Sequence, residues 1–298
     1  MKILIAEDDT TSRLTLAATL KKFGHEVTAV STGKAALQAW QRDVYPMLIS
    51  DWMMPELDGL QLCRAVRSEN RQHYTYVILL TALSGKDNQL DGMDSGADDF
   101  IIKPFDEDLL LARLRVAERI LELHEALRTE ATRDRLTGLL NRGAIMDFLQ
   151  QSLERRVREG GDVGVILIDL DHFKQINDQH GHLAGDAVLR ESARRMQAAL
   201  RPYDRIGRYG GEEFIVVSPQ ADGSNSAAIA ERIRSQLCAT PLSTPAGELT
   251  VTASLGVSHA AQLAEPAPDR LVALADAALY EAKRGGRNQV RLNFERDD

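Results

Sequence analysis

Short apolar segments alternate with segments of helical periodicity through the first third of this chain. The apolar segments are Lys2–Ala6, Val27–Val30, Met47–Ser50, Val77–Leu80 and Phe100–Ile102. The stretches between them, such as Thr11–Phe23 and Lys86–Gly96, are expected to be helices. Strands joined by helices form parallel sheets through right-handed crossovers, with helices on both faces. We therefore predict a doubly wound α/β domain around a five-stranded parallel sheet.

One long helix is expected to follow, because Asp106 to about Arg133 contains neither glycine nor proline. An apolar seam runs along it at alternating four- and three-residue steps and ends at a polar residue: Val116, Ile120, Leu123, Leu127 and Glu130. That spacing fits a short parallel coiled coil between two copies of the chain. A helix that packs back on its own domain would also explain it.

The second half, from Asp134, predicts another α/β domain. It contains the buried strand Val163–Leu170, a hairpin around Gly210 and Gly211, a strand pair near Leu249–Ser258 and a final strand Val290–Leu292. Because hairpins join antiparallel strands, we expect a mixed sheet here.

Composition excludes several classes of protein. Of 298 residues, 44 are acidic and 36 basic, a formal net charge of −8, so DNA binding is not expected. The two cysteines, Cys63 and Cys238, lack the spacing of a zinc site or a disulfide framework. Apolar runs such as Val165–Ile168 are too short to cross a bilayer, and the first residues do not resemble a signal peptide. We expect a soluble cytoplasmic protein with no membrane contact.

Polar residues follow four strands of the first predicted domain, and in a parallel sheet they converge on one edge. They are Glu7, Asp8 and Asp9 after the first strand, Asp51 after the third, Thr81 after the fourth and Lys103 after the fifth. Any one of them alone is better explained as a solvated strand end. Together they predict a Mg²⁺ site of carboxylate oxygens. Asp51 could then attack a phosphoryl group, with Lys103 and the Thr81 hydroxyl stabilising its oxygens.

This domain resembles the receiver domain of response regulators from Met1 to about Ala117. The resemblance is carried by IAEDD at 5–9, DWMMPELDG at 51–59, Thr81–Ala82 and Lys103–Pro104–Phe105. It implies that Asp51 accepts phosphate from a cognate histidine kinase. It also implies that Glu7, Asp8, Asp51 and the Met53 carbonyl hold Mg²⁺, that Phe100 is the aromatic residue coupled to Thr81, and that the Lys103–Pro104 bond is cis.

The second domain contains Arg208-Tyr-Gly-Gly-Glu-Glu-Phe between two strand-like segments. Gly210 and Gly211 predict a tight two-residue turn with positive φ, where a ligand can approach the backbone. An ordinary hairpin would explain the glycines but not the two acids after them. Asp169, at the end of a buried strand, and Glu212 could share a Mg²⁺ ion.

Further residues of this domain match a guanine nucleotide. Asn177 and Asp186 offer an amide beside a carboxylate, which fits the donors and acceptors of the guanine edge. Lys283 and Arg287, four residues apart, could bind phosphates, although solvated surface positions are the commoner fate of such residues.

Together these features resemble the GGDEF family of diguanylate cyclases over roughly Asp134–Phe294. The opening segment DRLTGLLNR at 134–142 matches the family, with Arg135 in place of the usual His, and GGEEF at 210–214 is a common variant of the name motif. The expected domains are a receiver (1–117), a helical linker (118–133) and a GGDEF catalytic domain (134–298) related to nucleotidyl cyclases.

The resemblance also implies roles for individual residues. Asp169, the Leu170 carbonyl and Glu212 would bind Mg²⁺, with Glu212 as a base and Glu213 as a further metal ligand. The nucleotide would be held by Asn177, His182, Asp186, Lys174, Lys283 and Arg287, with Gly210 and Gly211 beneath it. Arg201 and Asp204, with Arg232, resemble an inhibitory site for the product.

The implied reaction condenses two GTP into cyclic di-GMP and two pyrophosphates, with one GTP on each of two facing domains. A homodimer regulated by phosphorylation is therefore expected. Three alternatives exist. A non-catalytic GTP or cyclic di-GMP receptor usually lacks acids retained here, a DNA-binding regulator would carry a helix-turn-helix pattern that does not appear, and Asp186 disfavours a cyclase of other base specificity.

Overall fold

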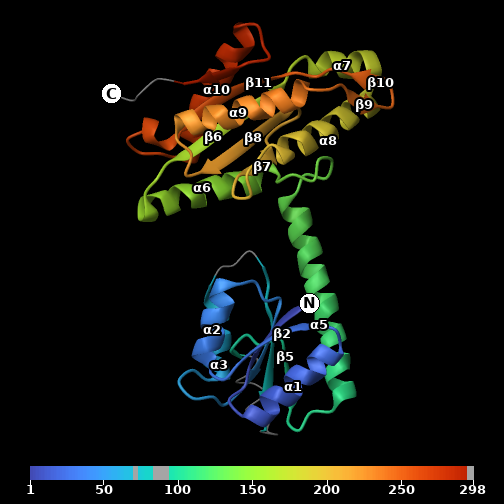
Figure 1. Cartoon of the computed structure of the whole chain (residues 1–298), viewed down its shortest axis with the longest axis vertical. Coiled ribbons are helices and arrows are strands. Elements are labelled where there is room, and N and C mark those ends of the chain that lie inside the picture. The colour runs from blue at the N-terminus through green and yellow to red at the C-terminus, as the bar shows by residue number, and fades with distance from the viewer. Residues whose placement is uncertain (70–72, 83–93, 294–298) are drawn as a thin grey trace. The chain divides into compact units, whose positions relative to one another are not determined.

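The structure, a computed structural model, describes residues 1–69, 73–82 and 94–293. The chain forms two compact units, Met1–Arg128 and Thr129–Asp298 (Figure 1). The helix expected over Lys86–Gly96 lies almost entirely outside the described residues.

The first unit contains a parallel sheet in the strand order β2-β1-β3-β4-β5, as predicted. Its elements are β1 (Lys2–Ala6), α1 (Thr10–Lys22), β2 (Glu26–Val30), α2 (Gly33–Arg42), β3 (Met47–Asp51), α3 (Gly59–Ser68), β4 (Tyr76–Thr81), β5 (Asp99–Ile102) and α5 (Glu107–Thr132). Helices α1 and α5 cover one face and α2 and α3 the other, each over its own apolar core (Figure 1). Parallel strands buried on both faces bring their carboxyl ends to a single edge, which positions the first site.

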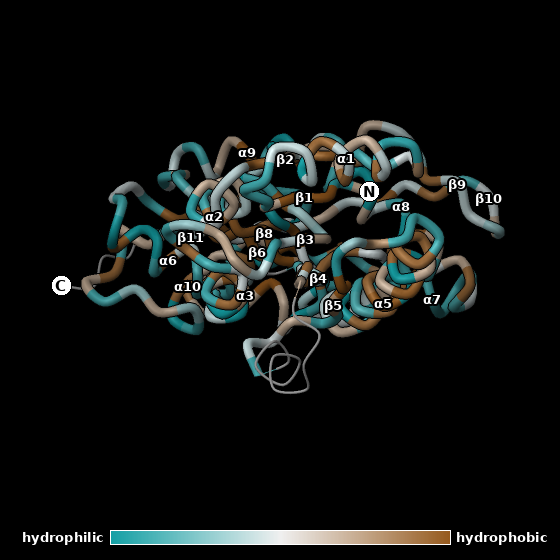
Figure 2. The backbone as a smooth tube through the Cα atoms, turned by 90° about the horizontal axis from the view of Figure 1, so that it is seen from below, coloured by the Kyte–Doolittle hydropathy of each residue, from teal (hydrophilic) through white to brown (hydrophobic). Residues whose placement is uncertain are grey.

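Helix α5 agrees with the long helix expected from Asp106 to about Arg133, and the Asp106 carboxylate caps it by accepting from the Leu109 N–H at 3.0 Å. Its first half buries Leu110 and Leu114 on the receiver sheet. Ile120 also packs against that core, whereas the predicted seam placed it against a second copy of the chain. Hydropathy colouring shows apolar positions along α5 among polar ones (Figure 2).

The second unit is built on a mixed sheet in the order β12-β11-β6-β8-β7, as predicted. Its elements are α6 (Arg142–Glu159), β6 (Val163–Leu170), α7 (Phe173–His180), α8 (His182–Ala198), β7 (Arg205–Arg208), β8 (Glu213–Pro219), α9 (Gly223–Cys238), β9 (Leu242–Thr244), β10 (Gly247–Leu249), β11 (Ala253–His259), η1 (Ala260–Gln262), α10 (Pro268–Arg284) and β12 (Val290–Leu292). The strands expected near Leu249–Ser258 are not partners, because β10 pairs with β9 while β11 pairs with β6.

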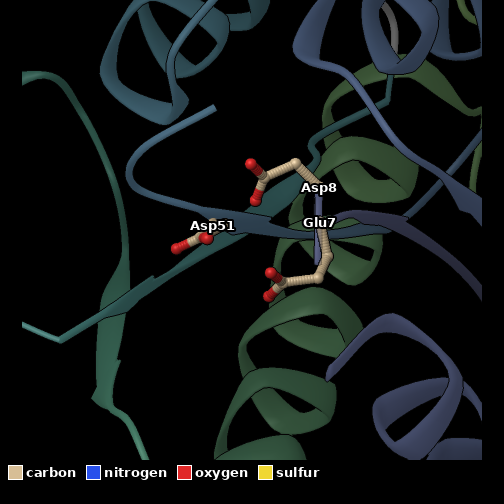
Figure 3. A group of neighbouring side chains, drawn as sticks. All are labelled: Glu7, Asp8 and Asp51. Carbon is tan, nitrogen blue, oxygen red and sulfur yellow. The ribbon is translucent and has the colours of Figure 1, made fainter. Parts of the chain in front are cut away.

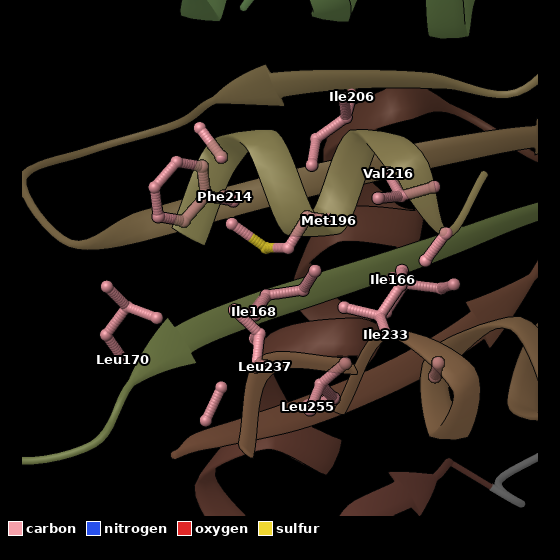
Figure 4. Close-up of a cluster of buried hydrophobic side chains, with 14 of the residues drawn as sticks. Ile166, Ile168, Leu170, Met196, Ile206, Phe214, Val216, Ile233, Leu237 and Leu255 are labelled. Atoms are coloured by element: carbon pink, nitrogen blue, oxygen red, sulfur yellow. The ribbon is translucent and has the colours of Figure 1, made fainter. Parts of the chain in front are cut away.

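Apolar side chains cover both faces of this sheet. Helices α8 and α9 pack on one face, where Met196, Ile233 and Leu237 meet Phe214 and Ile168 (Figure 4). Helices α6 and α10 pack on the other. The core fixes β6 and β8 side by side, and the ends of these two strands form the second site.

Candidate functional sites

Three carboxylates meet at the carboxyl-end edge of the receiver sheet (Figure 3). Glu7 and Asp8 follow β1, Asp51 ends β3, and one oxygen of each lies within 4.8 Å of the others. The parallel register that pairs Ala6 with Ser50 brings them together. An oxygen-only cluster of this kind suits a hard divalent cation.

Lys103 partly neutralises this acidic cluster. Its ammonium lies 2.7 Å from Glu7 and 2.9 Å from Asp51. Burial raises the pKa of Glu7, which is 1% exposed. Burial alone would lower the pKa of Lys103, but the hydrogen bonds to Glu7 and Asp51 outweigh it and raise that pKa. Both interactions keep the ammonium charged beside the acids.

The remaining receiver residues lie where the sequence predicted. Thr81 ends β4 and is buried, Phe100 lies in β5 and Met53 is exposed beside Asp51. The Lys103–Pro104 peptide bond is cis, as the resemblance implied.

In the second unit, the register of β6 and β8 decides which acid faces Asp169. The residue paired with Asp169 is Glu213, whereas Glu212 precedes β8 and its carbonyl accepts from the Leu170 N–H at 3.3 Å. Directly paired residues project from the same face of a sheet. Glu213 is therefore the acid directly across from Asp169. The role of Glu212 as a base and metal ligand stays a prediction.

Burial raises the pKa of both Asp169 and Glu213. Lys283, near the end of α10, counters this at Asp169, where its ammonium lies 2.8 Å from the carboxylate. Arg287 is also among the positive charges that lower the pKa of Asp169. Asp169 and Glu213 are thus costly to ionise, and the positive charges of Lys283 and Arg287 offset part of that cost at Asp169.

The hairpin between β7 and β8 is not the predicted two-residue turn. Neither Gly210 nor Gly211 has positive φ, because four residues, 209–212, connect the strands and the Tyr209 N–H closes the loop on the Glu213 carbonyl at 2.8 Å. The glycines supply space instead: a Cβ on Gly210 would lie 2.6 Å from a Glu213 carboxylate oxygen, and one on Gly211 would meet nothing within 4 Å.

Arg208 and Asp134, whose roles the sequence analysis missed, hold this hairpin in place. The Arg208 guanidinium donates to the Gly211 carbonyl at 2.8 Å and forms an ion pair with Asp134 at 3.1 Å. The position of Asp134 at the start of the family's opening segment was the available signal.

Four of the predicted nucleotide residues lie on two successive helices, α7 and α8. Asn177 is on α7 and Asp186 on α8, and a Cβ on Gly185 would lie 1.9 Å from the Asn177 side-chain oxygen. Gly185 therefore allows Asn177 to lie against α8. Lys174 and His182 are exposed on the same two helices.

Arg201 and Arg232 share one corner of the second unit. Arg232 donates to the Ala199 carbonyl at 2.6 Å, two residues before Arg201. Asp204 is buried, and its carboxylate accepts from the Ser218 hydroxyl at 2.5 Å and the Arg201 N–H at 3.0 Å. Asp204 therefore lies inside this corner and holds the backbone of Arg201 in place.

Comparison with known proteins agrees with this geometry. The model of the family "Diguanylate cyclase, GGDEF domain" matches residues 131–289, and that of the response regulator receiver domain matches residues 3–115. The chain belongs to the GGDEF diguanylate cyclase family. This GGDEF family member also carries a response-regulator receiver domain.

Response regulator PleD of Caulobacter vibrioides is 33% identical to this chain over 97% of the chain and 65% of PleD. The chain thus spans less than two thirds of that relative's length. Diguanylate cyclase SiaD of Pseudomonas aeruginosa, solved in complex with its activator SiaC, aligns with a TM-score of 0.53 and 37% identity over 62% of this chain and 71% of that one. The coiled coil and GGDEF domain of DgcB from Caulobacter crescentus, solved in complex with c-di-GMP, aligns with a TM-score of 0.56 and 32% identity over 62% of this chain and 98% of that one.

Among the residues that the structure describes, no helix is long and apolar enough to span a membrane.

Proposed function

We propose that this protein is a diguanylate cyclase whose activity is controlled by phosphorylation of its receiver domain. Each of two GTP molecules offers its 3′-hydroxyl to the α-phosphate of the other. Two phosphodiester bonds form, two bonds between α- and β-phosphates break, and two pyrophosphates and two protons leave. The product is cyclic di-GMP.

One observation carries the proposal: Asp169 and Glu213 face each other across β6 and β8 with Lys283 at 2.8 Å from Asp169. A buried Asp169 and a half-buried Glu213 form a site that a cation would stabilise, and the lysine beside them can bind phosphate. Phosphoryl transfer needs this kind of positioning and charge neutralisation.

Oxygen donors fit a divalent cation at both sites. In the GGDEF unit Asp169, the Leu170 carbonyl, Glu212 and Glu213 would hold Mg²⁺. In the receiver Glu7, Asp8, Asp51 and the Met53 carbonyl would hold it. When bound, Mg²⁺ neutralises phosphate oxygens and lowers the pKa of the attacking hydroxyl.

The protein's own residues would bind and orient the nucleotide. The Asn177 amide would donate to and accept from the guanine edge, and the Asp186 carboxylate would accept from it. Lys174, Lys283 and Arg287 would contact the triphosphate. The loop at Gly210 and Gly211 leaves room for the ligand beside the backbone.

The test is incubation of the purified chain with GTP and Mg²⁺, followed by nucleotide chromatography. We expect cyclic di-GMP from GTP and no product from ATP. Glu213→Gln and Asp169→Asn should each lower the rate by about 10²-fold or more. A chain that binds GTP but yields no product would instead be a non-catalytic receptor.

We also propose that a histidine kinase phosphorylates Asp51. Asp51 lies half-buried at the sheet edge with Lys103 at 2.9 Å, and the new charge would favour one receiver conformation. A small phosphodonor or beryllofluoride should raise the cyclase rate of the wild type. The proposal fails if Asp51→Asn responds to phosphodonor as the wild type does.

Product inhibition is the third part of the proposal. Arg201 and Arg232 lie at one corner and could bind the phosphates of cyclic di-GMP. We expect Arg201→Ala to make product without slowing as it accumulates. Unchanged inhibition in that variant would remove this part and leave the cyclase assignment intact.

A further inference from the structure

Asp171 is a buried carboxylate that follows β6, two residues after Asp169. It is 5% exposed, and three donors converge on it. One oxygen accepts from the Ser254 hydroxyl at 2.7 Å, and the other accepts from the Thr252 hydroxyl at 2.8 Å and from the Asn288 N–H at 3.0 Å. All three donors are neutral, and their hydrogen bonds compensate for the burial of this group.

The bond to Asn288 fixes an unusual turn after α10. Arg287 and Asn288 both adopt left-handed backbone conformations, with φ of 63° and 44°. Such conformations cost free energy in residues other than glycine and persist where surrounding contacts hold them. Here the Arg287 N–H donates to the Ala282 carbonyl at 3.1 Å, and Asp171 receives the next N–H along the chain.

This turn brings the Arg287 backbone to the second site. Lys283, four residues before Arg287, lies 2.8 Å from Asp169, and the next residue after Arg287 bonds to Asp171, two residues after Asp169. We infer that Asp171 is a positioning residue for Arg287: it anchors the turn at Asn288, so that the guanidinium meets the phosphates of a nucleotide bound over Asp169. This inference rests on the proposed function.

A double-mutant cycle with the full chain tests it. Asp171→Ala removes the acceptor of the Asn288 N–H and should release the turn. We expect it to raise the KM for GTP about tenfold, the size of one charged hydrogen bond, with a smaller change in kcat. Arg287→Ala should have a similar effect, and the double variant should be no worse than Arg287→Ala alone.

Ser254→Ala is the matched control, because it removes a donor from the other oxygen of Asp171 and leaves the bond to Asn288 in place. Its KM should stay within about twofold of the wild type. If the Asp171 and Arg287 effects multiply, or if Ser254→Ala raises KM as much as Asp171→Ala, Asp171 has only a structural role and the inference is wrong.

Equilibrium binding of the analogue GTPαS provides the same cycle without turnover. A chain that makes no cyclic di-GMP but shows the coupling in GTPαS binding would refute the cyclase assignment and keep the inference. Amide hydrogen exchange of the wild type tests the same anchor without a substitution, so the test still works if a variant fails to fold. A protected Asn288 amide supports the anchor, and exchange as fast as in an open loop overturns it.

Discussion

At the scale of single residues, the receiver site holds three carboxylates but only one lysine that bonds to them among the described residues. Glu7, Asp8 and Asp51 approach within 4.8 Å of one another, and Lys103 is the cation that bonds to two of them. Carboxylates held close together to bind an ion repel one another and destabilise the fold when the ion is absent. The free energy of unfolding should therefore depend on divalent cations.

Asp8→Asn should reveal this cost, because it removes one of the crowded charges. In EDTA we expect the variant to be more stable than the wild type by about 1 kcal/mol. In excess Mg²⁺ the order should reverse, because the wild type binds the ion more tightly. Urea unfolding followed by tryptophan fluorescence measures this, since Trp40 and Trp52 both lie in the receiver. Asp43→Asn is the control, and equal responses of Asp8→Asn and wild type to Mg²⁺ would contradict the idea.

His25 gives the receiver a dependence on pH. Burial lowers its pKa, and its Nδ1 atom is buried without a partner among the described residues. In the unfolded chain the imidazole takes up a proton at about pH 6.5, while in the fold it stays neutral to lower pH. The unfolded state then binds more protons, so the receiver loses stability as pH falls below about 6.5.

The variant His25→Gln should weaken this loss. We expect its stability, measured by the same tryptophan signal, to change less than that of the wild type between about pH 7.5 and 5.5. The negative charge of Glu118 raises the pKa of His25, but this effect is smaller than the lowering by burial. Identical pH profiles for the two proteins would show that His25 is not the group responsible.

At the scale of elements, the close approach of α7 and α8 depends on one glycine. A Cβ on Gly185 would lie 1.9 Å from the Asn177 side-chain oxygen, so Gly185→Ala must displace Asn177. We expect the KM for GTP to rise about tenfold or more while the unit stays folded. Gly143→Ala in α6 is the control, since its Cβ would meet the nearest atom at 3.5 Å. A Gly185→Ala variant with wild-type KM would exclude Asn177 from the nucleotide site.

The elements also show how far the sequence could predict the structure. The alternation of apolar and helical segments predicts both sheets, because burial on two faces leaves continuous apolar strands such as Val163–Leu170. It could not predict that Glu213 faces Asp169, since a shift of one residue in register exchanges the faces of a strand. The predicted positive φ at Gly210 and Gly211 is also wrong. The length of the loop depends on where strand pairing stops, and the sequence does not show that point. The buried role of Asp171 depends on donors from β11 and from the turn at Asn288, which are distant in sequence.

At the scale of the whole molecule, α5 leaves apolar residues uncovered where it extends beyond the receiver core. Leu123 and Leu127 are 63% and 64% exposed, and Val116 is also exposed. Residues at such steps lie on one face of a helix and can pair with the same face of a second copy. If catalysis joins two half-sites, this seam sets the effective concentration of one relative to the other.

The double substitution Leu123→Glu and Leu127→Glu should separate the copies, because charges on a shared apolar face repel each other and are costly to bury. We expect sedimentation to show a loss of dimer and the cyclase rate per chain to fall at least about tenfold at low protein concentration. Raising the protein concentration should restore part of that rate, which would not happen if the substitutions had damaged the catalytic unit. Thr129→Glu is the matched control, because Thr129 lies about 200° around the helix from Leu127 and should leave both readouts unchanged. A double variant that sediments and turns over GTP as the wild type does would place the dimer contact elsewhere on the chain.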